Sequence, residues 1–379
     1  GKVLAELEQD GLAEDTIVFF YGDHGSGMPR NKRWPYDSGL RVPLIVHVPE
    51  KFRHLAPPEY RVGGISDRMV GFVDLAPTVL SLAGIRPLEW MQGGAFMGSH
   101  AAPPREFNYG FRGRMDERCD MVRSVTDGRY VYIRNYMPHK IYGQHLAYMF
   151  ETPTTQVWHD LYHQGKLKPP RTYFWETKPP EELYDLQEDR DEVRNHVRSP
   201  KHQQMLARLR KAQQQFAADI RDVGFLPERE IHTRSRGSTP YQVGHDDRRY
   251  PMKRIMETAE LASSLESGVD AELIKRMQDS DSAVRYWAAM GILMRGAKAV
   301  TAAAEPLRAA LEDRSPEVRV VAAEALGRYG GEDDLRPALR TLGTLAPPDS
   351  NGVYLSIMAL NAIDALGDKA RPLMGRLKA

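Results

Sequence analysis

Residues 19–46 read FFYGDHGSGMPRNKRWPYDSGLRVPLIV, in which a polar loop rich in glycine and proline joins two apolar runs. The runs at 17–21 and 42–48 are short and rich in β-branched and aromatic residues, which predicts strands of a sheet buried on both faces. Residues 70–83 show a helical pattern with Pro77 in the first turn, where its missing N–H costs nothing. Strands that alternate with helices predict a layered α/β fold.

The composition limits the classes of protein to consider. The 379 residues predict two or three domains, and 52 basic against 51 acidic residues leave no basic footprint for nucleic acid. No apolar run reaches the roughly 18 residues of a membrane-spanning helix. We therefore expect neither a nucleic-acid partner nor a membrane span. The single cysteine, Cys119, excludes an internal disulfide and a cysteine-based zinc site, and we interpret it as a structural thiol.

The chain is expected to contain four segments. Residues 121–136, MVRSVTDGRYVYIRNY, place two strand-like runs around an Asp-Gly pair, which is a strong hairpin signal. A helical pattern at about 201–222 would pack on this hairpin. Tyr241 and Tyr250 would anchor a surface connection rich in glycine, proline and charge. The expected segments are an α/β core at 1–105, a small β-sheet subdomain with a helix at 106–225, an irregular connector at 226–262, and helical repeats at 263–379.

The carboxyl-terminal segment repeats itself. Residues 281–293, DSAVRYWAAMGIL, match residues 314–326, RSPEVRVVAAEAL, and the matching Val, Arg and Ala positions are 34 residues apart. A third partial copy, NAIDALG, ends at Gly367. A period in this range is typical of a helical solenoid, and the segment resembles HEAT repeats. The alternative interpretation is an ordinary alanine-rich helical bundle.

The opening stretch contains residues suited to binding an anion beside a metal. Asp23 and His24 follow the first strand, at the edge of an α/β sheet where sites form. A carboxylate oxygen suits calcium, whereas an imidazole nitrogen suits zinc better. Lys32 offers a compact ammonium that would neutralise an oxyanion, as sulfate or phosphate transfer requires. The alternatives are that Asp-His-Gly only ends a strand and that Lys32 is solvated.

Six short motifs follow one another between residues 22 and 195. They are GDHG at 22–25, Lys32, Tyr36-Asp37, GLRVP at 39–43, GFVDLAPTVLSLAGI at 71–85, and ELYDLQEDRDEVRN at 182–195. Taken together, these motifs resemble the carboxyl-terminal half of a sulfatase of the alkaline-phosphatase superfamily, and the similarity covers about residues 1–225. The resemblance implies an alkaline-phosphatase-like layered sheet, a small antiparallel sheet subdomain, and the α-helical HEAT-like solenoid.

The resemblance also implies roles for individual residues. Asp23 and His24 would bind the active-site metal, which is calcium in most sulfatases, and Lys32 would be a catalytic residue that contacts the sulfate. Asparagine is also common at the position of His24, which leaves the metal open. Sulfatases use a formylglycine made from the Cys or Ser of a Cys/Ser-x-Pro-x-Arg motif, together with an Asp-Asp pair. No Cys/Ser-x-Pro-x-Arg motif occurs in this sequence, and no Asp-Asp pair lies within residues 1–225. We therefore expect a fragment that does not hydrolyse a sulfate ester alone.

Two further residues are candidates for substrate binding. Arg114 lies in a cluster of arginines ahead of the hairpin and would reach an anionic substrate, although a salt-bridged surface is the alternative. His139 lies with Lys140 and His145 among aromatic residues and would line a sugar pocket. The alternative for this second group is that its residues only pack a long loop.

The sequence thus predicts a sulfuric ester hydrolase that removes sulfate from an organic sulfate, with a sulfated glycan preferred. One alternative is a phosphodiesterase or phosphonate hydrolase of the same superfamily. Another is a catalytically dead binding or scaffold protein, because helical solenoids present extended surfaces to partners. We also expect a protein partner for the repeats and, from the habit of sulfatases, a periplasmic or secreted location.

Overall fold

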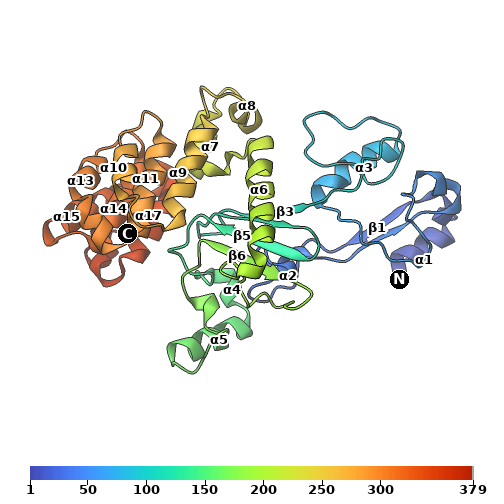
Figure 1. The fold of residues 1–379 in the computed structure, drawn as a ribbon, viewed down its shortest axis with the longest axis horizontal. Coiled ribbons are helices and arrows are strands. Elements are labelled where there is room, and N and C mark those ends of the chain that lie inside the picture. Colours follow the sequence, from blue (N-terminus) through green and yellow to red (C-terminus); the bar gives the residue numbers. More distant parts are fainter. Residues whose placement is uncertain (378–379) are drawn as a thin grey trace. The chain divides into compact units, whose positions relative to one another are not determined.

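The computed structural model describes residues 1–377, which form two compact units interleaved along the chain (Figure 1). Unit 1 consists of residues 1–110, 124–133 and 183–213, and unit 2 consists of residues 111–123, 134–182 and 214 onward. The fold class is mixed α/β, with small antiparallel sheets and a helical carboxyl-terminal region, as expected. The four segment boundaries stay a prediction. Within the described residues, every helix is too short or too polar to cross a lipid bilayer.

A two-stranded antiparallel sheet lies near the start of unit 1. Strands β1 (Val18–Tyr21) and β2 (Leu44–His47) pair so that Phe20 lies opposite Ile45. These two side chains are 61% and 59% exposed, so the expectation that both faces of the sheet are buried is wrong for this pair. The other face contacts a small core of Val48, Phe96 and Met97. Helix α1 (Lys2–Gln9) precedes β1, and helix α2 (Asp37–Leu40) lies between the two strands in sequence.

The helix expected at 70–83 is present in unit 1 as α3 (Leu75–Leu82). It begins after a short 3-10 turn, Phe72–Asp74, and Pro77 lies in its first turn, as predicted. The Asp74 carboxylate is buried and accepts the backbone N–H groups of Gly71 at 2.7 Å and Gly94 at 2.9 Å. It also pairs with Arg105. This carboxylate therefore holds the loop after α3 against the start of the helix.

The second sheet contains the predicted hairpin. Its four strands are β3 (Asn108–Arg112), β4 (Val122–Thr126), β5 (Tyr130–Asn135) and β6 (Glu181–Asp185), and they follow the order β3-β4-β5-β6. Helix α6 (Gln203–Asp219) corresponds to the helix expected at about 201–222. The Asp127 carboxylate accepts the N–H groups of Arg129 and Tyr130, which closes the turn between β4 and β5. Leu206 and Leu209 of α6 are buried in a core with side chains of the sheet.

The segment expected to be an irregular connector is mostly helical, so that expectation is wrong. It contains α7 (Glu228–Arg234), α8 (Pro240–Gly244) and the start of α9 (Met252–Ser264). Proline precedes or begins each of the three helices, where it is compatible with the first turn. Tyr250 is buried and donates to the Asp222 carbonyl, so it anchors the segment as expected. Tyr241 is 49% exposed and is not buried as an anchor.

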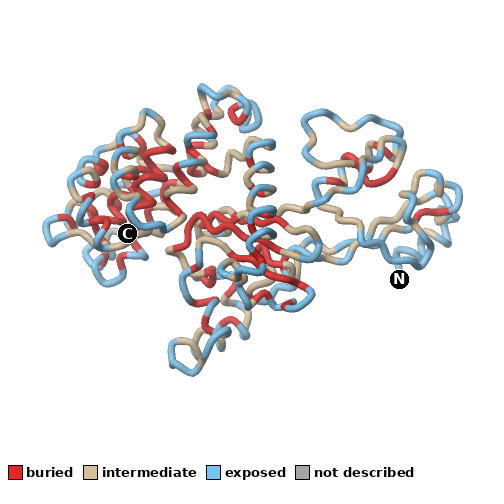
Figure 2. The backbone as a smooth tube through the Cα atoms, in the orientation of Figure 1, coloured by how far each residue is buried: buried red, intermediate tan, exposed pale blue. Residues whose placement is uncertain are grey.

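The carboxyl-terminal helices stack as the sequence repeat predicts. Helix α11 (Ser282–Met294) packs against α9 and α14 (Pro316–Tyr329), and α14 packs against α15 (Glu332–Leu345) and α17 (Val353–Ala365). Figure 2 shows these central helices as buried, and their small alanines permit the close approach. The other helices of unit 2 are α4 (Ala147–Phe150), α5 (Pro153–His163), α10 (Asp270–Arg276), α12 (Ala297–Ala302), α13 (Ala304–Ala310), α16 (Pro348–Asn351) and α18 (Met374–Leu377).

Candidate functional site

Asp23 and His24 lie side by side directly after β1 in unit 1. His24 Nδ1 lies 2.5 Å from the carbonyl oxygen of Gly25, so this nitrogen carries the hydrogen and donates it. The other ring nitrogen, Nε2, lies 3.3 Å from Asp23 Oδ2. Carboxylate oxygens and imidazole nitrogens are both ligand types of divalent metal ions. The pair therefore suits a divalent metal.

The same two side chains do not form a complete metal site. The Asp23 side chain is 85% exposed and the His24 side chain is 34% exposed, so both are accessible to a metal ion and to its other ligands. Among residues 1–377, no group of three or more His, Cys, Asp and Glu side chains is arranged to hold a metal. Calcium takes six to eight oxygen ligands. Asp23 and His24 offer two ligands at most, and binding of a metal by them stays a prediction.

Two glycines fix the loop that contains Lys32. A Cβ on Gly25 would lie 2.0 Å from the carbonyl oxygen of Ser38, and a Cβ on Gly39 would lie 2.2 Å from two backbone carbonyl oxygens of the loop. The N–H of Gly25 donates to the carbonyl of Gly39 at 2.9 Å. Only glycine permits this close approach of backbone to backbone. The glycines of GDHG and GLRVP therefore hold the two ends of the Lys32 loop together.

Lys32 itself lies in a distorted part of this loop. Its N–H donates to the carbonyl of Ser26 at 3.0 Å, which folds the loop back on itself. Arg30 and Arg33, on either side of Lys32, have φ angles of 67° and 82°, in the region that favours glycine. Such backbone strain is concentrated at functional sites. The structure thus places Asp23, His24 and Lys32 in one loop whose backbone is tightly constrained.

A second motif segment supports this loop within unit 1. The Arg30 guanidinium donates to the carbonyls of Asp191 at 2.8 Å and Glu192 at 3.0 Å, and it lies 4.3 Å from the centre of the Tyr36 ring. The N–H of Asp37 donates to Glu192 Oε2 at 2.9 Å. The sequence did not predict these contacts. Its only indication was that 182–195 and the Lys32 loop belong to one set of motifs.

Arg114 and His139 lie in unit 2, whereas Asp23, His24 and Lys32 lie in unit 1. The Arg114 guanidinium binds the Glu228 carboxylate through two hydrogen bonds, of 2.6 and 3.1 Å. These bonds raise the pKa of Arg114 above its usual value. Such pairing is what a salt-bridged surface would show, and binding of substrate by Arg114 stays a prediction.

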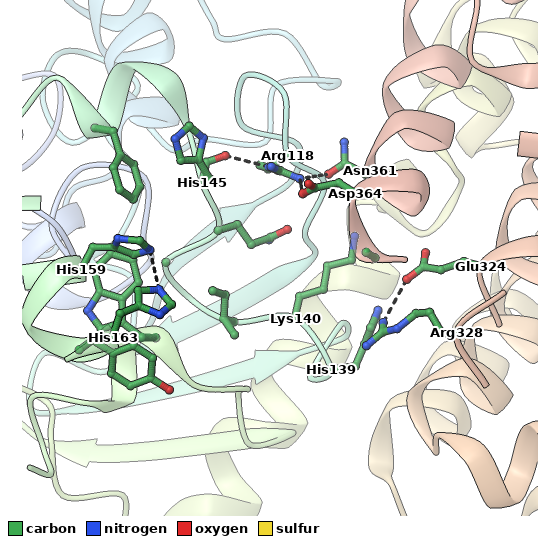
Figure 3. A pocket seen from close by; sticks show the side chains of 17 residues that line it. Arg118, His139, Lys140, His145, His159, His163, Glu324, Arg328, Asn361 and Asp364 are labelled. Carbon is green, nitrogen blue, oxygen red and sulfur yellow. Dashed lines mark hydrogen bonds and ion pairs between the residues drawn. The ribbon is translucent and has the colours of Figure 1, made fainter. Parts of the chain in front are cut away.

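His139 lines a pocket of unit 2 together with Lys140 and His145, the group that the sequence indicated (Figure 3). Burial, with help from neighbouring cations, lowers the pKa of His139 well below its usual value, so the ring is neutral. The sequence analysis missed His159, His163 and Trp175, which also line the pocket. The spacing of His159 and His163, one helical turn apart, was the only local signal.

Cys119 is the one thiol of the chain. Burial raises its pKa above the usual value, which keeps the sulfur protonated and weakly reactive at neutral pH. This environment agrees with the interpretation of Cys119 as a structural residue.

Comparisons with known proteins agree with the motifs. Residues 1–85 match the family model for sulfatases, and residues 271–361 match the family model for HEAT repeats. An ulvan-active sulfatase of Formosa agariphila is 40% identical over 233 residues, which cover 61% of this chain and 38% of the relative. The human N-sulphoglucosamine sulphohydrolase is 26% identical over 231 residues, which cover 55% of this chain and 43% of the relative.

A solved structure of a protein with its substrate D-glucosamine-2-N,6-O-disulfate aligns over 59% of this chain and 38% of that chain, at 18% identity and a TM-score of 0.40. That likeness adds nothing to the assignment. The family matches confirm the resemblance to sulfatases, whose model matches residues 1–85, and the resemblance to HEAT repeats, whose model matches residues 271–361. It spans less than half the length of these curated relatives.

Proposed function

We propose that this chain supplies metal-binding and sulfate-binding residues to a sulfuric ester hydrolase that acts on a sulfated glycan. The observation that carries the proposal is the glycine-pinned loop, in which Asp23, His24 and Lys32 occur in the order of the sulfatase motifs. Relatives that share this sequence include an ulvan-active sulfatase and an N-sulphoglucosamine sulphohydrolase. Their names favour a sulfated saccharide as the substrate class.

The three residues have separate roles in the proposed reaction. Asp23 contributes a carboxylate oxygen and His24 contributes Nε2 to a divalent metal, which we propose is calcium. When bound, this ion would polarise the oxygens of the sulfate group. The ammonium of Lys32 neutralises negative charge on the sulfate, as pre-positioned cations do in transfer reactions. The nucleophile, which is formylglycine in sulfatases, would come from residues outside this sequence.

Unit 1 has exposed apolar side chains, and they support the proposal that residues outside this sequence complete a sulfatase domain. Phe20 and Ile45 form one open face of the β1–β2 sheet, and Val3 and Leu4 of α1 are 69% and 54% exposed. Exposed apolar faces of this kind mark interaction surfaces. We propose that other parts of a complete sulfatase domain cover them, and that the 379-residue chain alone does not release sulfate. We also propose a periplasmic or secreted location.

The role of Lys32 is tested in the natural full-length protein. Lys32→Met removes the ammonium but keeps most of the side chain, and Lys2→Met, at an exposed position of α1, is the matched control. We expect the first variant to reduce sulfate release from sulfated oligosaccharides by about 100-fold or more, the effect of losing one charge-stabilising group. Equal activity of Lys32→Met and the control would refute the role of Lys32.

The same assay separates the alternative functions. Sulfate esters should be hydrolysed much faster than phosphate diesters or phosphonate esters, and the reverse preference would favour a phosphodiesterase or phosphonate hydrolase. If the full-length protein neither binds calcium nor hydrolyses any of these esters, the binding or scaffold function of the repeats becomes the better account.

A further inference from the structure

Unit 2 contains a cavity of about 420 Å³ that the proposed sulfate chemistry does not use. The loop after β5 contributes His139 and Lys140, and α5 contributes His159 and His163. Helices α14 and α17 of the repeats contribute the opposite side, as Figure 3 shows. The volume is within the range of ordinary small-molecule sites.

Several polar atoms of this cavity lining are buried without a hydrogen-bond partner in the described residues. Trp175 is only 4% exposed, and its Nε1 has no acceptor. Both ring nitrogens of His139 are likewise buried and unpaired. A buried donor left unpaired costs about 1–3 kcal/mol, so such groups call for a polar partner. Two residues that line one cavity therefore contain unpaired polar atoms.

The charges of the lining leave one cation available. Arg118 pairs with Asp364 at 2.8 Å, and Arg328 pairs with Glu324 at 3.2 Å, so these four groups neutralise one another. Lys140 forms no ion pair or side-chain hydrogen bond with any residue in 1–377. Its ammonium is therefore the uncompensated charge of the cavity, and it favours an anionic ligand.

Aromatic rings form another part of the lining. Phe150 stacks on His145 with ring centres 4.4 Å apart and meets the ring of His159 at 5.2 Å. Trp175 and Tyr162 lie next to this group, with ring centres 6.4 Å apart. Aromatic faces bind the C–H faces of a ring-shaped ligand, and their polar atoms remain available for hydrogen bonds.

We propose that this cavity binds an acidic saccharide unit, whose carboxylate or sulfate group pairs with Lys140 and whose ring contacts the aromatic lining. Hydroxyl groups of the sugar would accept hydrogen bonds from Trp175 Nε1 and pair with His139. A bare metal ion is a poorer occupant, because residues 1–377 contain no group of three metal-binding side chains and the cation Lys140 would oppose it. The binding does not depend on hydrolysis of a sulfate ester.

Calorimetric titration of the 379-residue chain tests the proposal with four probes. Hyaluronan tetrasaccharide carries carboxylates without sulfate, a carrageenan oligosaccharide carries sulfate without carboxylate, and cellotetraose carries neither. Sodium sulfate tests for an adventitious ion only. We expect binding of at least one acidic oligosaccharide, and the two acidic probes then identify the anionic group. Equal binding of cellotetraose, binding of free sulfate as tight as that of the oligosaccharides, or no binding would overturn the proposal.

Variants locate the binding in the cavity. Lys140→Met should weaken binding of the acidic oligosaccharide about tenfold or more, as expected for loss of one charged hydrogen-bonding partner. Lys298→Met, at an exposed position of α12, is the matched control and should bind normally. Trp175→Phe keeps an aromatic ring but removes the N–H, and it should weaken binding without abolishing it. Equal affinity of Lys140→Met and Lys298→Met would overturn the assignment.

Discussion

A buried ionic cluster in unit 2 permits a quantitative prediction about stability. Asp120 Oδ2 lies 2.7 Å from Lys178 Nζ and 3.4 Å from Arg112 Nε, and all three side chains are at most 1% exposed. Burial alone would raise the pKa of Asp120, but Lys178 and Arg112 outweigh this effect and lower it. The Asp120 carboxylate therefore pairs with two buried cations.

Asp120→Asn keeps the shape of the side chain but removes its charge. Lys178 and Arg112 would then lose this buried counter-charge, which we expect to reduce the free energy of unfolding by about 3–5 kcal/mol. That is a large part of the roughly 5–15 kcal/mol of an ordinary domain. A second substitution, Lys178→Met, should restore part of the loss, because it removes one of the two cations that faced the Asp120 carboxylate.

Urea denaturation followed by far-ultraviolet circular dichroism measures this effect. The matched control is Asp368→Asn, because Asp368 pairs with Arg371 at 3.0 Å but is 88% exposed. An exposed pair contributes about 0–1 kcal/mol, so the control should have nearly the stability of the native chain. The reasoning would be refuted if Asp120→Asn were no more destabilising than the control, or if the double variant were less stable than Asp120→Asn.

The structure supports three further predictions. Gly39→Ala should loosen the Lys32 loop and increase its hydrogen exchange, because the new methyl would lie 2.2 Å from backbone oxygens; unchanged exchange would contradict this. Burial lowers the pKa of His139, so stability should fall as the pH drops below 6.5, where the unfolded histidine gains a proton that the folded one does not. His139→Gln should reduce this dependence in urea titrations, and an identical profile would count against it. Cys119 should react with iodoacetamide slowly before unfolding and quickly afterwards, and fast reaction of the native chain would show that the thiol is accessible.

Elements with local signals were predictable from the sequence. The hairpin at Asp127 was evident because its turn chemistry lies within a few residues, and the repeat helices were evident from their period. The connector at 226–262 was misinterpreted because prolines suggested breaks, whereas Pro227, Pro240 and Pro251 lie at helix starts, where they do no harm. Whether a proline interrupts a helix depends on its position in that helix, which the sequence alone does not reveal.

The candidate sites were likewise predictable from the sequence only in part. The order of the motifs identified Asp23, His24 and Lys32 as candidate site residues, and the structure places them in one loop with a constrained backbone. The sequence indicated only some of the residues that line the cavity. Trp175 and the helices α14 and α17 join His139 through contacts between residues far apart in sequence. No short-range pattern encodes such contacts.

Sulfate release from a sulfated oligosaccharide tests the central claim most directly. It should be measured for the 379-residue chain alone and for the natural full-length protein, including any residues that precede Gly1, at equal concentration and with calcium present. We predict release by the full-length protein and none by the chain alone, because Asp23, His24 and Lys32 supply only part of the proposed site. Steady release by the 379-residue chain, or none by the full-length protein, would contradict the account.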